Sequence, residues 1–252
     1  MIDMNEITYD DVVKYWKSMN ISNGTDLDVA VNGMAVLLAY HTTKLEEPEV
    51  SFDDTREIFE HGRVVGYTGD IKDLFALRNA KRGWEDLLEA YDHKDAIDED
   101  LIKRFHFALT EGTYDERRYA KGERPGQYKI GEYVTGIHEI GALAEDVKDE
   151  VDELLSDLDD ADDNKILVAA AFFHAKFENI HAFADGNGRV GRLLMNYFLV
   201  LHNHPVVIIH VEDRREYMSA LEAWDTEQDL EPLVEFLRKQ TIKTWKKILE
   251  KR

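Results

Sequence analysis

Proline is scarce in this 252-residue chain, and this scarcity constrains the fold more than any other feature. The only prolines are Pro48, Pro125, Pro205 and Pro232, and the glycines cluster in a few places. Proline breaks helices and glycine weakens them, so their absence from long stretches favours long helices separated by defined breaks. We therefore predict a mainly α protein that forms a single helical bundle domain.

Apolar residues at helical spacing define the expected helices, with Ser51 and Asp70 as N-caps and Gly62 close to a helix end. These helices cover residues 9–19, 26–46, 51–61, 70–90, 98–109, 144–158, 164–180, 190–201, 213–224 and 229–249. Residues 111–141 differ because they combine Pro125 with several glycines and tyrosines, and residues 127–130 and 133–137 predict a short β-hairpin. We expect an N-terminal helical region over residues 1–69, packed on a core domain over residues 70–252.

The charge balance excludes some classes of partner. The chain has 31 basic and 52 acidic residues, which gives a formal net charge of −21. Such a chain repels nucleic acid and anionic membranes, so neither is an expected partner. No apolar run is long enough to span a membrane, and the first residues lack the pattern of a secretory signal. We expect a soluble cytoplasmic protein.

Residues 181–192 read H-A-F-A-D-G-N-G-R-V-G-R and lie between two strongly apolar stretches. Gly186 and Gly188 allow backbone conformations that turn successive N–H groups toward one point, beside the start of the next helix. Arg189 and Arg192 lie three residues apart and can both reach phosphate oxygens. Asp185 is compatible with a phosphate when a cation such as Mg²⁺ lies between them.

His181 completes this set, because its imidazole titrates near neutral pH and could accept a proton from an attacking hydroxyl. Phe183 has no such chemistry and is expected to anchor the loop in the core. A histidine at a helix end, or a Gly-Asn-Gly turn, is more often structural when it occurs alone. The combination of base, metal ligand, anion site and arginines favours the transfer of a phosphorus group to a hydroxyl.

The segment 181–192 resembles the signature of Fic-domain proteins, the AMP-transferring enzymes, with Ala182 in place of the usual proline. The resemblance implies that a Ser, Thr or Tyr hydroxyl of a target protein attacks the α-phosphate of ATP. It assigns His181 as the base, Asp185 as the Mg²⁺ ligand, Gly186, Asn187 and Gly188 to the α- and β-phosphates, and Arg189 and Arg192 to the outer phosphates. A related branch that phosphorylates its target has lysine at the position of Gly188, so this glycine favours AMP transfer.

Residues 125–140 resemble the flap of the same family, which implies that the target protein binds there by adding a strand. Tyr128 and Tyr133 lie on this segment and could be sites of self-modification. Related proteins often dimerise, so a homodimer is also an open expectation.

An upstream segment, about 26–47, resembles the self-inhibitory helix of many Fic proteins. Thr42 and Glu46 match its spacing, although Glu47 stands where Gly or Asn is usual. The resemblance implies that Glu46 pairs with Arg192 and keeps that arginine away from the γ-phosphate. A charge-assisted pair is strong enough to compete with one phosphate contact. The alternative is a solvated glutamate at the polar end of an amphipathic helix.

Two other functions remain open. Glu46 could orient a water that hydrolyses AMP from a modified target, or the chain could be a nucleotide-binding regulatory protein with little turnover. The intact His181 and Asp185 argue against the second. Among smaller signals, Tyr217 and Leu221 fit a core better than an adenine slot, and Asn203 is a candidate adenine contact.

Overall fold

The protein is almost entirely helical in a computed structural model that describes residues 7–31, 33–47, 49–133, 141–159 and 165–251. The helices are α1 (Tyr9–Ser18), α2 (Gly24–Ala30), α3 (Met34–Glu46), α4 (Phe52–His61), α5 (Ile71–His93), α6 (Glu99–Thr110), α7 (Glu116–Ala120), α8 (Val147–Asp159), α9 (Ile166–Ile180), α10 (Asn187–Leu201), α11 (Arg214–Glu227) and α12 (Glu231–Leu249). A 3₁₀ turn, η2 (Val211–Asp213), precedes α11. The predicted mainly α fold is confirmed.

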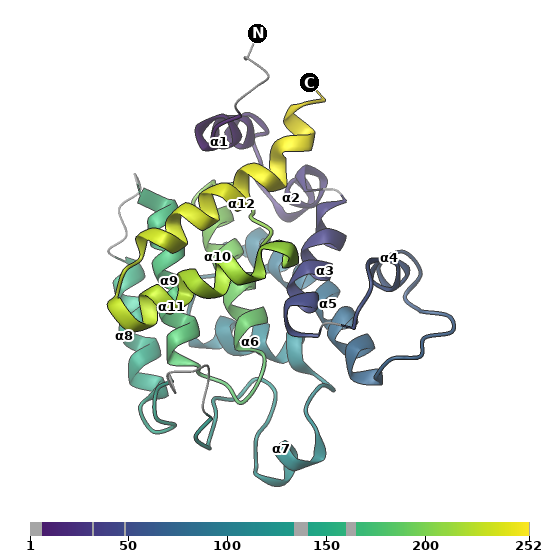
Figure 1. Cartoon of the computed structure of the whole chain (residues 1–252), viewed down its shortest axis with the longest axis vertical. Coiled ribbons are helices and arrows are strands. Elements are labelled where there is room, and N and C mark those ends of the chain that lie inside the picture. The colour runs from purple at the N-terminus through teal and green to yellow at the C-terminus, as the bar shows by residue number, and fades with distance from the viewer. Residues whose placement is uncertain (1–6, 32, 48, 134–140, 160–164, 252) are drawn as a thin grey trace.

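Helix α10 lies at the centre of the bundle (Figure 1). Nearly all of its residues are buried, as expected of a helix that is apolar around its whole circumference. It packs against α9, α6, α5 and α3, so four neighbours fix its position. Its N-terminal turn follows the predicted loop directly, and the rigid core therefore places the start of α10 at the candidate site.

The N-terminal helices pack on this core. Trp16 of α1 meets Trp245 of α12 edge to face, with ring centroids 5.5 Å apart. Helix α3 packs against α5 and α10, and its Leu38 belongs to the same hydrophobic core as Trp245. This one core draws residues from both sides of the expected boundary at residue 69. The division into two regions remains a prediction.

The expected helix over residues 26–46 is wrong in one respect, because the structure has two helices there. Helix α2 ends at Ala30 and α3 begins after Gly33, whose φ of 79° is left-handed and cannot continue an α-helix. The break also changes which apolar residues face inward: Val31 and Leu38 are buried, whereas Val29 is 68% exposed. Helix α10 starts at Asn187 rather than at residue 190, and α7 was not expected at all.

The capping residues give the more reliable boundaries. Ser51, Asp70 and Asp98 each accept a backbone N–H at the start of α4, α5 and α6, as their sequence positions predict. Gly62 ends α4 in a left-handed conformation, also as expected.

The predicted β-hairpin is not confirmed, because none of the described residues forms a strand. In the first half, the Lys129 N–H donates to the Ala182 carbonyl at 2.9 Å. The N–H groups of Ile130 and Gly131 both donate to Glu123 Oε1 at 3.1 Å. These backbone donors therefore bind partners outside a hairpin. Most of the second half, 134–140, lies outside the described residues.

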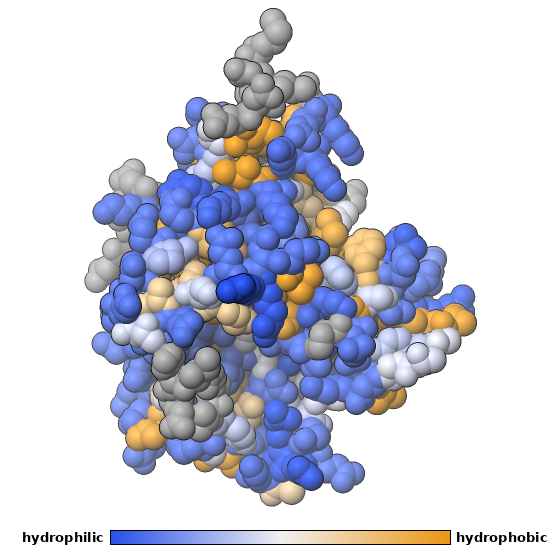
Figure 2. Space-filling model, in the orientation of Figure 1, coloured by the Kyte–Doolittle hydropathy of each residue, from blue (hydrophilic) through white to orange (hydrophobic). Residues whose placement is uncertain are grey.

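The surface is largely hydrophilic, with a few separate hydrophobic patches (Figure 2). Among the described large apolar side chains, Val65 is 82% exposed and Ile71 is 68% exposed, both near the arm formed by α4 and the loop after it. No described helix combines the length and the apolar composition that a membrane crossing requires.

The buried core predicts a contrast between two leucines. Leu87 of α5 is fully buried, whereas Leu37 of α3 is 37% exposed. We expect Leu87→Ala to lower the free energy of unfolding by about 2–5 kcal/mol because it leaves a cavity, and Leu37→Ala to lower it by less than about 1 kcal/mol. Urea unfolding followed by circular dichroism measures both. Equal losses would contradict the described packing.

Candidate active site

The loop between α9 and α10 has a left-handed residue at each end. His181 closes α9 with φ 51°, and Gly186 opens α10 with φ 88°. No side chain caps the start of α10, so helix geometry leaves the N–H groups of Asn187, Gly188 and Arg189 without intrahelical partners. These residues border a cavity of about 520 Å³. An uncapped helix N-terminus beside a cavity favours an anion.

Two side chains hold the loop in shape. Asn187 Oδ1 accepts the Phe183 N–H at 2.9 Å, and Asn187 Nδ2 donates to the Phe183 carbonyl at 2.8 Å. The His106 ring stacks on the Phe183 ring at 3.7 Å, and Phe183 is fully buried, as expected for a core anchor. The Asn187 amide oxygen and one amide hydrogen are thus used within the loop, and the Asn187 backbone N–H remains available to a phosphate.

His106 of α6 connects this loop to the segment that follows α7. Its Nε2 donates to the Asp185 carbonyl at 2.9 Å, and its Nδ1 accepts the Gly126 N–H at 2.7 Å. Since a carbonyl only accepts and an amide N–H only donates, these two bonds require the neutral ring with its hydrogen on Nε2. Burial also lowers the pKa of His106 to about 3. Sequence reasoning missed this residue; the only signal was a histidine among the apolar residues of α6.

His181, the predicted base, is uncharged at neutral pH. Burial and then the nearby Lys129 ammonium lower the pKa of His181 to about 4, so the imidazole is free to accept a proton. Lys129 is itself buried, and no hydrogen bond to its Nζ is found. The Lys129 N–H donates to the Ala182 carbonyl and the Ala142 N–H donates to the Ile180 carbonyl, both at 2.9 Å. Lys129 and Ala142 are thus held on the two sides of His181.

Arg192 joins α10 to α3. Its Nε donates to Thr42 Oγ1 at 2.8 Å, and its Nη2 donates to the Thr42 carbonyl at 3.1 Å and to Glu46 Oε1 at 2.8 Å. The guanidinium is buried, whereas the Glu46 side chain is 37% exposed. Burial raises the pKa of Glu46, but the neighbouring Arg192 lowers it more, so the net pKa lies below the usual range and Glu46 is ionised. The structure therefore brings together the three residues that the resemblance singled out.

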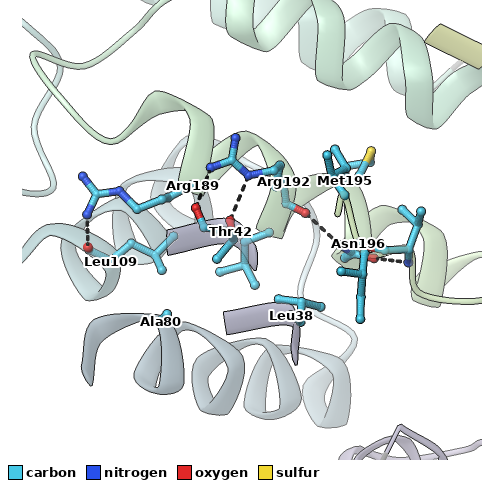
Figure 3. A pocket seen from close by; sticks show the side chains of 12 residues that line it. Leu38, Thr42, Ala80, Leu109, Arg189, Arg192, Met195 and Asn196 are labelled. Atoms are coloured by element: carbon cyan, nitrogen blue, oxygen red, sulfur yellow. Dashed lines mark hydrogen bonds between the residues drawn. The ribbon is translucent and has the colours of Figure 1, made fainter. Parts of the chain in front are cut away.

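Figure 3 shows the inner side of this arrangement. Leu38, Ala80, Thr42 and the two arginines border an interior cavity of about 20 Å³, large enough for about one water molecule. Arg189 Nη1 donates to the Leu109 carbonyl at 3.3 Å. Both guanidinium groups thus bind partners in the protein interior, and both arginines also border the larger cavity.

Gly188 is required by the pair between Glu46 and Arg192. A Cβ built at residue 188 would collide with Glu46 Oε1 and would lie 2.9 Å from Arg192 Nη1. A lysine at this position would therefore displace the glutamate. The steric constraint is independent of the argument from the related branch of the family.

The carboxylate of Asp185 lies between two arginines. Its Oδ1 is 3.4 Å from Arg189 Nη2, and its Oδ2 is 3.5 Å from Arg118 Nη2. Sequence reasoning did not connect Arg118 with this site, because Arg118 belongs to α7 and no local pattern links it to residue 185. No group of three or more potential metal-binding side chains occurs among the described residues. Asp185 would supply one carboxylate to an ion, and waters or the phosphates of a bound substrate would supply the other ligands.

Helix α11 forms another wall of the large cavity, through Arg214, Tyr217, Met218 and Leu221. Tyr217 is buried, and its hydroxyl lies 2.7 Å from His174 Nε2, which fits the predicted core role. Leu221 borders the cavity, so its assignment to the core was incomplete. Asn203 is not among the described residues that line the cavity. Burial raises the pKa of Glu178, on the cavity wall, to about 8, so it is protonated at neutral pH.

A model of the Fic/DOC family matches residues 96–199, which include α6 and the whole loop with its two arginines. The chain contains a Fic domain. A Caenorhabditis briggsae relative named protein adenylyltransferase fic-1 is 30% identical over 207 residues, 81% of this chain and 39% of the relative. An Aedes aegypti relative named protein adenylyltransferase Fic is 43% identical over 75 residues, 30% of this chain and 15% of the relative. The chain thus spans about two fifths, or less, of these relatives.

Solved structures share the fold. A Fic-domain signalling protein from Bacteroides thetaiotaomicron aligns over 96% of this chain and 95% of its own, with a TM-score of 0.81 and 23% identity. Fic-1 from Caenorhabditis elegans aligns over 96% of this chain and 72% of its own, with a TM-score of 0.74 and 22% identity. Because these alignments cover nearly all of the described chain, the helices outside residues 96–199 also follow the Fic fold.

His106 predicts a defined pH dependence of stability. Its native pKa of about 3 lies below the ordinary value of 6.5, so between these values the unfolded chain binds a proton that the native protein does not. The free energy of unfolding therefore falls as the pH decreases below 6.5, by about 1.4 kcal/mol per pH unit from this residue. We expect His106→Asn to reduce the slope between about pH 6 and pH 5 by that amount. Urea unfolding across this interval measures it, and an unchanged slope would contradict a buried neutral His106.

Proposed function

We propose that this protein is an adenylyltransferase that moves AMP from ATP to a Ser, Thr or Tyr hydroxyl of a target protein. One observation carries the proposal: a neutral histidine, a carboxylate, two arginines and an uncapped helix N-terminus border the same cavity. The volume of about 520 Å³ suits a nucleotide. The two relatives described above are named protein adenylyltransferases, which supports the same activity for this protein.

The reaction follows from the roles of these groups. The oxygen of the target hydroxyl forms a bond to the α-phosphorus, while the bond from this phosphorus to the bridging oxygen breaks and pyrophosphate leaves. His181 accepts the hydroxyl proton. The backbone N–H groups at the start of α10 donate to the α- and β-phosphate oxygens, and Arg189 and Arg192 balance charge on the outer phosphates. The apolar wall at Met218 and Leu221 offers a surface for the adenosine.

A magnesium ion at this site would be held by Asp185 together with waters and nucleotide phosphates. Mg²⁺ binds through one or two carboxylates plus substrate phosphates and waters, and Asp185 borders the cavity as one such carboxylate. When bound, the ion would neutralise phosphate charge that develops as pyrophosphate leaves. The hydrogen bond from His106 to the Asp185 carbonyl supports this role, because it holds the loop backbone at that residue.

The target protein would be presented by residues 125–140. The hydrogen bonds from Lys129 and Ala142 to the backbone on either side of His181 support this, because they hold these two residues next to the base. Recognition of a strand reads backbone groups and tolerates many side chains. Self-modification remains part of the proposal: the Tyr133 hydroxyl donates to Glu123 Oε1 at 2.8 Å, so it would have to leave this carboxylate first.

Glu46 would hold the enzyme in an inhibited state. Its contact with Arg192 uses an N–H donor that the outer phosphate of ATP would otherwise receive. A charge-assisted hydrogen bond contributes about 1.5–3 kcal/mol, enough to change a population about tenfold or more. The nucleotide could then bind with its phosphates in an unproductive pose.

The two adjacent glutamates at the end of α3 allow a matched test. Glu46 binds Arg192, whereas Glu47 binds Lys72 Nζ at 2.7 Å, away from the site. With ATP labelled at the α-phosphate, we expect Glu46→Gly to increase labelling of itself or of lysate proteins by at least about tenfold. Glu47→Gly should label as wild type does. His181→Ala should abolish the labelling, because it removes the proposed base.

The outcomes separate the alternatives. Equal labelling by the two glycine variants would exclude inhibition by Glu46 while leaving the transferase intact. No labelling by any variant, with nucleotide still bound, would indicate a regulatory binding protein. Release of label from a target already carrying AMP, dependent on Glu46, would identify the reverse hydrolysis.

A further inference from the structure

Arg118 is a third arginine at the candidate active site, and it comes from the short helix α7. Its Nη2 lies 3.5 Å from Asp185 Oδ2, while Arg189 Nη2 lies 3.4 Å from Oδ1. Each oxygen of the carboxylate therefore faces a different guanidinium. Asp185 is the residue that the proposed function assigns to the metal, so Arg118 occupies one of the positions from which a cation would approach.

The two arginines differ in how firmly they are held. Arg189 has a 1% exposed side chain and donates to the Leu109 carbonyl from α6. Arg118 has a 30% exposed side chain and packs its guanidinium over the Tyr114 ring, 5.6 Å from the centroid. A second charged contact among the described residues is Asp115 Oδ2, 3.7 Å from Nη1, and Asp115 is the N-cap of the same short helix. Arg118 can thus leave Asp185 more easily than Arg189 can.

The remaining groups around Asp185 show why a counter-ion is needed there. Glu46 borders the same cavity and repels Asp185, because each carboxylate disfavours the charge on the other. Arg192 faces Glu46 and Thr42 rather than Asp185. Without Arg118, a single distant contact to Arg189 would balance the charge of Asp185.

We propose that Arg118 is the resting counter-ion of Asp185 and that an incoming divalent cation displaces it. The inference rests on the proposed function, because that function assigns the metal to Asp185. A guanidinium and a metal ion compete for the same carboxylate oxygens and repel each other. Arg118 therefore lowers the affinity of Asp185 for a free cation, and the substrate-bound cation, which brings phosphate ligands of its own, replaces it more readily.

Competition between Arg118 and the metal ion predicts that removal of Arg118 changes metal binding in the opposite direction from removal of a supporting residue. Removing a residue that merely supports Asp185 would weaken metal binding, whereas removing a competing cation strengthens it. We expect Arg118→Gln to bind Mn²⁺ about threefold more tightly than wild type, the size of effect that a partly exposed ion pair produces. Arg118→Lys, which keeps the charge, should restore an affinity close to that of wild type.

The experiment uses Mn²⁺ alone, without nucleotide, and follows the free ion by electron paramagnetic resonance during titration of the full chain. Asp185→Asn defines the background binding to the acidic surface, and only the component that it removes is compared. Arg117→Gln is the matched control, because it removes the same charge from the neighbouring, exposed position. Displacement of Mn²⁺ by Mg²⁺ then gives the relative Mg²⁺ affinities of the variants. Thermal unfolding in the presence of a chelator verifies that each variant is folded.

Tighter Asp185-dependent binding in Arg118→Gln than in both wild type and Arg117→Gln would support the proposal. Equal or weaker binding in Arg118→Gln would overturn it and leave the proposed function standing. If no variant shows Asp185-dependent binding, the counter-ion proposal fails, while the labelling assay with ATP tests the proposed function separately. The two failures are therefore distinguishable.

Discussion

The contacts of Arg192 with Thr42 and Glu46 are the interaction on which the arrangement of the site depends. They join the central helix to a helix about 150 residues earlier in the chain, and they do so through a side chain buried on one side and facing the large cavity on the other. A side chain at Gly188 would enter the space that the Glu46 carboxylate occupies. The pair thus couples the packing of α3 to the charge available in the cavity, so any change in one alters the other.

A second set of residues supports the loop and leaves its outward face free. Asn187 and Phe183 close the loop on itself, and His106 fastens it to α6 and to Gly126. Buried polar groups must find partners within the protein, and here they bind one another. The consequence is that the N–H groups at the start of α10 have no internal partner to compete with a phosphate. Side chains and carbonyl groups hold the shape of the loop, whereas backbone N–H groups at the start of α10 remain available to bind the phosphate.

Local patterns explain which features could be predicted from the sequence. The caps at Ser51 and Asp70, and the loop from residue 181, depend on neighbours within a few positions, and the structure has them where they were expected. A glycine alone does not reveal the break at Gly33, because Gly83 lies inside α5 and continues that helix, whereas Gly33 adopts a left-handed angle. Arg118 and His106 reach the site through contacts with residues 67 and 79 positions away, which no local spacing reveals. The expected hairpin used backbone donors that the folded chain directs to Glu123 and Ala182.

The position of Glu46 within its helix has a further consequence. Glu46 is the last residue of α3, and the next N–H in the chain already bonds back to Thr43 at the helix end. Terminal turns of helices open at a small fraction of the free energy needed to unfold a domain. The contact with Arg192 can therefore be lost by fraying of a single turn, while Leu38 and the earlier part of α3 stay packed in the core. A signal that stretches or binds only the connection to α4 would be sufficient to do this, and it would not need to approach the nucleotide.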